Sequence, residues 1–121
     1  MKNQTYRMTM LFDFYGDILT ERQRELFDLY YNEDLSLAEI AENCGISRQG
    51  VRDVIVHAEA AMNELEDKTG LLKRFMRMQD SVDAIVAAAN EIKTINYRQY
   101  ENHRLEELAD SIIAGAGVLK E

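Results

Sequence analysis

Apolar residues recur every three or four positions along most of the chain, the spacing that places them on one face of an α-helix. From Thr5 to Asp17 they follow the i, i+3, i+4, i+7 pattern of an amphipathic helix, with Thr5 as its cap. Thr20 is a good cap for a second helix. The broad apolar face of this second helix consists of Leu26, Phe27, Leu29, Tyr30 and Tyr31. A polar turn, residues 32 to 34, follows it.

Residues 36 to 57 have the pattern of a helix-turn-helix. Ser36 and Glu39 have the spacing of a capping box at the start of its first helix. Gly45 stands where that helix must end in a left-handed backbone conformation. Ser47 is placed to cap the second helix. The apolar positions of the motif are Leu37, Ile40, Ala41, Ile46, Val51, Ile55 and Ala58.

Helical spacing continues to Gly70 and then through a long amphipathic helix predicted from about residue 71 to 93. A final helix is predicted from about 97 to 114, with Gly115 and Gly117 marking its fraying end. We expect a helix-turn-helix bundle over residues 1–68 and a helical extension over 69–121.

The apolar stripes of the extension are too extensive to stay in water. They either fold back on the first domain or pack against another copy, and we favour a homodimer. Met76 and Met78 fit core packing better than an adaptable protein-binding groove.

Composition supports an all-α fold, because the chain has no proline, no tryptophan and only six glycines. No apolar run approaches the roughly 20 residues that span a bilayer, so we expect no membrane insertion. No signal peptide is visible, because Asp13 interrupts the first apolar cluster. Cys44, the single cysteine, permits no internal disulfide and suits core packing at a helix end. These features favour a cytoplasmic protein.

The candidate nucleic-acid-binding residues lie at the start of the second helix of the motif, where DNA-binding helix-turn-helix proteins contact bases and phosphates. Arg48, Gln49 and Arg52 are predicted to point away from the core. Arginine pairs with guanine and glutamine with adenine in the major groove, whereas the alternative is a solvated helix face. Ser47 is mainly a cap, with a phosphate contact as its secondary role.

Arg22 and Arg24 could contact backbone phosphate, although ion pairs with neighbouring carboxylates fit them better. The carboxylates at suitable spacing are Glu21, Glu25 and Asp28.

Net charge argues against simple DNA binding, which depends on phosphate neutralisation. The chain carries −8, and residues 1 to 70 alone hold 7 Lys and Arg against 14 Asp and Glu. The segment with the helix-turn-helix is therefore the acidic one.

No catalytic constellation is visible, so we expect no enzyme, no cofactor and no metal site. His57 and His103 are far apart and lack partners at metal-ligand spacing, which favours surface or partly packed side chains.

Two segments carry a family resemblance. Thr20-Glu-Arg-Gln-Arg-Glu-Leu and Leu35-Ser-Leu-Ala-Glu-Ile-Ala-Glu, followed by Ile46-Ser-Arg-Gln, resemble region 4 of sigma-70-type factors, which grips the −35 promoter element. The aromatic cluster of Phe12, Phe14 and Tyr15 lies outside that pattern. Over about residues 5 to 75 the chain more closely resembles the YlxM family of small helix-turn-helix proteins. That resemblance implies a helical fold and a regulatory role linked to the signal recognition particle.

The second helix of the motif departs from this family at several positions. Relatives tend to have Ala and Tyr at Gly50 and Arg52, and a basic pair at Val56-His57. Glycine inside a helix costs about 1 kcal/mol relative to alanine. Two hypotheses follow: a regulator that binds DNA or RNA, or a protein adapter of the signal recognition particle with the motif as a scaffold.

Overall fold

The computed structural model describes residues 5–120, and they are almost entirely helical. The α-helices are α1 (Thr5–Tyr15), α2 (Glu21–Tyr31), α3 (Leu37–Cys44), α4 (Arg48–Thr69), α5 (Leu71–Ile95) and α6 (His103–Val118). A 3-10 turn, η2 (Gly16–Ile18), follows α1, and a π-helical turn, η3 (Asn96–Tyr100), follows α5. No strand occurs among these residues, which confirms the all-α prediction. The chain divides into two compact units, residues 1–72 and 73–121.

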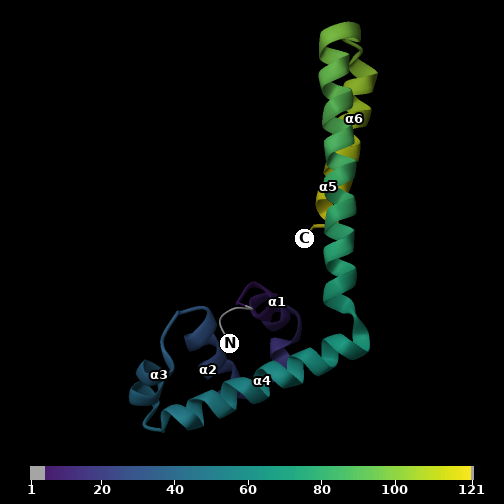
Figure 1. Ribbon diagram of the computed structural model, residues 1–121. Helices are drawn as coiled ribbons and strands as arrows, with labels where there is room; N and C mark the ends of the chain where they lie inside the picture. The colour runs from purple at the N-terminus through teal and green to yellow at the C-terminus, as the bar shows by residue number, and fades with distance from the viewer. Residues whose placement is uncertain (1–4, 121) are drawn as a thin grey trace. The chain divides into compact units, whose positions relative to one another are not determined.

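Helix α4 is the central helix of the first unit, and α1, α2 and α3 all pack against it (Figure 1). Its buried apolar side chains are Val51, Ile55, Ala58 and Met62, which recur every three or four residues. They meet a core in which the largest fully buried side chain is Phe27 of α2. Phe27 stacks on Phe12 with 4.8 Å between the ring centroids, so Phe12 of α1 packs against the core.

A buried polar cluster fixes the end of α4. The Tyr15 hydroxyl donates to Glu66 Oε1 at 2.7 Å and lies 2.6 Å from Thr69 Oγ1. Glu66, which is 8% exposed, also accepts the Leu72 amide at 2.9 Å. Gly70 ends α4 in left-handed backbone at φ 63°. The carboxylate thus satisfies one of the orphan amides at the start of α5.

The second unit is a hairpin of two antiparallel helices, α5 from residue 73 onward and α6 (Figure 1). Lys93 pairs with Asp110 at 2.7 Å and Asp83 pairs with Lys120. The residue number therefore decreases along α5 as it increases along the second helix, which is the pattern of antiparallel helices. The seam between the helices is made of Val82 and Ala89 on α5 and Ala109 and Ala116 on α6.

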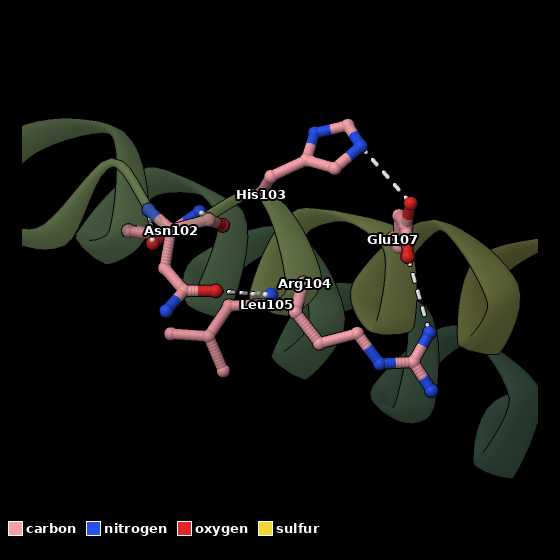
Figure 2. A network of polar contacts seen from close by, with 6 residues as sticks. Asn102, His103, Arg104, Leu105 and Glu107 are labelled. Atoms are coloured by element: carbon pink, nitrogen blue, oxygen red, sulfur yellow. Dashed lines mark hydrogen bonds and ion pairs between the residues drawn. The ribbon is translucent and has the colours of Figure 1, made fainter.

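Both ends of the final helix differ from the sequence-based prediction. The final helix begins at His103 instead of 97, because Asn96 holds the turn through its side-chain amide. Asn96 is 4% exposed, accepts the Asn102 amide and donates to the Asn102 carbonyl, both at 2.8 Å. Asn102 then caps α6 by accepting the Leu105 amide, as Figure 2 shows. Helix α6 also continues through Gly115 and Gly117 to Val118, past the predicted end at 114.

The first helix is also shorter than predicted. It ends at Tyr15, and the chain tightens into the 3-10 turn over Gly16–Ile18. No helix among residues 5–120 is long and apolar enough to cross a membrane.

Candidate nucleic-acid interface

The helix-turn-helix has the local geometry that its sequence predicts. Ser36 and Glu39 form a reciprocal capping box, with both hydrogen bonds at 3.1 Å. Gly45 ends α3 at φ 69°, a left-handed conformation that costs a β-carbon-bearing residue about 1–2 kcal/mol. Cys44 is half-buried against the core, as is Ile46. These contacts fix the position of α4 relative to α3.

Three predicted contact residues gather at the start of α4. Arg48, Gln49 and Arg52 are all exposed, and with Leu37 of α3 they line one shallow depression of about 340 Å³. Positions three and four apart on a helix are neighbours, so these side chains share one face. The first turn of α4 contains no acidic residue. The depression therefore combines two guanidinium groups with an amide, and no carboxylate lines it.

Ser47 is the cap of α4. Its Oγ accepts the Gly50 amide at 2.9 Å, which confirms the predicted capping role. An acceptor oxygen in this position keeps its hydroxyl hydrogen available to donate. The helix N-terminus also favours an anion there through its partial positive charge.

Carboxylates lie just beyond this face. Asp53 accepts a hydrogen bond from Gln49 Nε2 at 2.9 Å, so Gln49 would have to exchange this partner for a base edge. Farther along α4, burial raises the pKa of the Glu59 carboxyl. A hydrogen bond with Tyr31 and the charge of Arg52 partly offset this rise. Burial also raises the pKa of Tyr31, and the Glu59 charge adds to that effect. Sequence spacing placed Arg48, Gln49 and Arg52 together but missed Asp53 as a competitor, although its i+4 position from Gln49 carries that signal.

None of the other predicted residues lines this depression. Arg22 and Arg24 are exposed on α2, and Arg24 lies 3.8 Å from Asp17. Asp17, in the 3-10 turn, was not among its expected partners. His57 is exposed on α4. His103 is exposed in the second unit, where its Nε2 lies 2.9 Å from Glu107 (Figure 2).

Comparison with known proteins identifies the family. Residues 2–110 match the family UPF0122, described as "Putative helix-turn-helix protein, YlxM / p13 like". A UPF0122 protein of Bacillus thuringiensis is 40% identical over 112 residues, which cover 93% of this chain and 96% of the relative. A UPF0122 protein of Acetivibrio thermocellus is 35% identical over 116 residues, covering 90% of this chain and 99% of the relative.

A third UPF0122 protein, from Thermoanaerobacter sp. (strain X514), is 49% identical over 78 residues, or 64% of this chain and 67% of the relative. The match over nearly the whole length agrees with the resemblance that residues 5 to 75 carry. This chain belongs to the UPF0122 family of YlxM / p13 like helix-turn-helix proteins.

Proposed function

We propose that this chain is a non-enzymatic, cytoplasmic regulatory protein that binds DNA or RNA through the start of α4. The observation that carries this proposal is the depression lined by Arg48, Gln49, Arg52 and Leu37 without a carboxylate. Arg48 and Arg52 supply bidentate donors for guanine or phosphate, and Gln49 supplies the donor and acceptor pair that adenine requires. The Ser47 hydroxyl and the helix N-terminus add a phosphate contact.

The proposed contact face is small, and the surrounding charge opposes it. Residues 1 to 70 hold twice as many carboxylates as cations, 14 against 7. Long-range steering of a polyanion is therefore unfavourable, and binding depends on short-range contacts at α4. We expect modest affinity with a marked preference for particular sites, because non-specific affinity comes mainly from phosphate neutralisation.

The test is a gel-shift series against genomic DNA fragments and signal-recognition-particle RNA at two salt concentrations. The double variant Arg48→Ala/Arg52→Ala should lose at least tenfold in affinity. A matched control, Arg98→Ala/Arg104→Ala, removes the same charge from the second unit and should bind like the unaltered protein. Equal losses in both double variants would show a general charge effect and remove α4 from the interface.

A second candidate function is a protein adapter of the signal recognition particle, in which the helix-turn-helix is a scaffold. The YlxM resemblance suggests that pathway, and a surface at the end of α1 favours a protein partner. Phe14 and Ile18 are 37% and 54% exposed there, next to the exposed carboxylates of Asp13 and Asp17. An acidic surface with apolar side chains suits a basic, amphipathic partner.

Affinity purification separates the two candidates. If the adapter function is correct, the particle or its receptor should co-purify with the chain and be lost from Phe14→Ser/Ile18→Ser. Arg48→Ala/Arg52→Ala should retain it. Retention by Phe14→Ser/Ile18→Ser, or no co-purification at all, would argue against the adapter.

A further inference from the structure

The hairpin of α5 and α6 leaves most of its large apolar side chains in water. Its seam is narrow, because three of the four apolar residues that close it are alanines. Met76 and Met78 are 42% and 38% exposed, so the prediction that they pack in a core is wrong for this chain as a monomer. The other exposed apolar side chains of the two helices are Ile85, Ile92, Ile95, Leu105, Leu108, Ile112 and Val118, with Leu119 just after α6.

Six of these side chains form two columns with a seven-residue period, one column along each helix. On α5 the buried seam positions Val82 and Ala89 are seven apart, as are the exposed Met78, Ile85 and Ile92 beside them. On α6 the buried Ala109 and Ala116 are seven apart, as are the exposed Leu105, Ile112 and Leu119. Two apolar columns per helix are the arrangement of a coiled-coil or four-helix-bundle core. In each helix only one of the two columns is buried.

The two exposed columns lie on the same face of the hairpin. At 3.6 residues per turn, Ile85 lies about 60° from Val82, and Ile112 lies about 60° from Ala109 in the same rotational sense. Because the helices are antiparallel, equal rotations bring both columns to one side of the seam. The ion pairs Lys93–Asp110 and Asp83–Lys120 use side chains on the opposite side. The hairpin thus has one apolar face and one ion-paired face.

Charge is divided between the two ends of the hairpin. Residues 73–84 and 111–120, at its open end, hold four cations and two carboxylates, a net charge of +2. Residues 85–110, toward its turn, hold three cations and five carboxylates, a net charge of −2. An antiparallel neighbour would place each basic end beside an acidic one.

The lengths of the helices favour the same arrangement. Lys120, two residues after the end of α6, pairs with Asp83, and residues 73–82 of α5 extend beyond α6 (Figure 1). This extension carries Lys73, Arg74, Arg77 and the exposed methionines. The acidic turn of a second hairpin would cover it.

We propose that two copies of this chain associate through the apolar faces of their hairpins, antiparallel, to form a four-helix bundle. Ile85 lies near the two-fold axis, and Met78 packs beside the partner subunit's Ile92. A two-fold interface requires a self-complementary surface, which the apolar columns and the divided charge both provide. The face is about 24 Å long along α6 and about 20 Å wide for two helices, so each copy contributes on the order of 500 Å², less than the roughly 800 Å² per partner of a standard interface. This inference is independent of nucleic-acid binding.

The mass of the full chain in solution tests the association. Light scattering after gel filtration should give twice 14.0 kDa at micromolar concentration. Ile85→Glu should shift the protein to the monomer, and circular dichroism reports whether it stays helical. The matched control Ala87→Glu adds the same charge two residues away, at an exposed position on the polar side of α5, and should remain a dimer. A monomeric unaltered protein, or a dimer that survives Ile85→Glu, would overturn the proposal.

Cysteine cross-linking tests the orientation without relying on a destabilised variant. In a Cys44→Ala background, Ile85→Cys should oxidise to a covalent dimer, because the two cysteines meet near the axis. Ile92→Cys should not, because equivalent positions would be about 20 Å apart. Rapid cross-linking through Ile92→Cys, with none through Ile85→Cys, would mean a parallel pair and contradict the antiparallel bundle.

Discussion

At the scale of single residues, the phenol of Tyr15 belongs to the buried polar cluster at the end of α4. It donates to the buried Glu66 carboxylate, which also holds the first turn of α5. Tyr15→Phe keeps the ring and removes this donor, leaving a buried carboxylate oxygen with one partner fewer. A buried group deprived of a partner costs about 1–3 kcal/mol. Urea denaturation should show that loss, whereas Tyr6→Phe, at a 70% exposed ring, should leave the midpoint unchanged.

Glu59 gives a pH-dependent prediction at the same scale. Its pKa is raised chiefly by burial, and its Oε1 is buried without a hydrogen-bond partner among the described residues. The folded protein therefore holds this proton more tightly than the unfolded chain does. Stability attributable to Glu59 must fall as pH rises from the ordinary glutamate pKa of about 4.3 through the raised folded value.

Glu59→Gln removes the charged form and should raise the denaturation midpoint at pH 7. The difference should vanish near pH 4, where the carboxyl of the unaltered protein is protonated. Glu42→Gln, at an exposed position on α3, serves as the control and should change little at either pH. A variant less stable than the original at pH 7 would contradict the sign.

At the scale of elements, alanine substitutions at two glycines of the helix-turn-helix should change the stability of the protein in opposite directions. A β-carbon at Gly50 would lie 3.2 Å from Ser47 Oγ, but Glu39 and Gln23 occupy the same capped position in α3 and α2 with side chains present. Gly50→Ala should therefore stabilise the protein by about 0.5–1 kcal/mol. Gly45→Ala, at φ 69°, should destabilise it by about 1–2 kcal/mol. Thermal melts of the pair measure both signs, and a loss of stability in Gly50→Ala would show that the cap cannot adjust.

The elements also show which parts of the fold local sequence can predict. Ser36, Gly45 and Ser47 specify their helix ends through contacts within a few residues, so the motif was predicted correctly. The π-helical turn was not, because Asn96 satisfies the backbone of a residue six positions away. The direction of Arg48 and Arg52 followed from helical spacing, whereas the pairing of Arg24 with Asp17 depends on how α1 and α2 meet.

At the scale of the whole molecule, the proposed dimer and the proposed interface make a joint prediction about salt. In each copy, the proposed contact face at the start of α4 carries two cations, Arg48 and Arg52. For duplex DNA, log affinity falls against log salt with a slope of about −0.9 for each phosphate neutralised. One face therefore gives a slope of about −2, and two faces bound to one duplex give about −4. The acidic remainder of the chain should add no further dependence of this sign.

Fluorescence anisotropy over a salt series, on a duplex long enough for two half-sites, measures the slope. Ile85→Glu should halve it by separating the copies, while Ala87→Glu should preserve it. Arg48→Ala/Arg52→Ala should bring it close to zero. A slope much steeper than −4 would mean that cations outside α4 contact the nucleic acid.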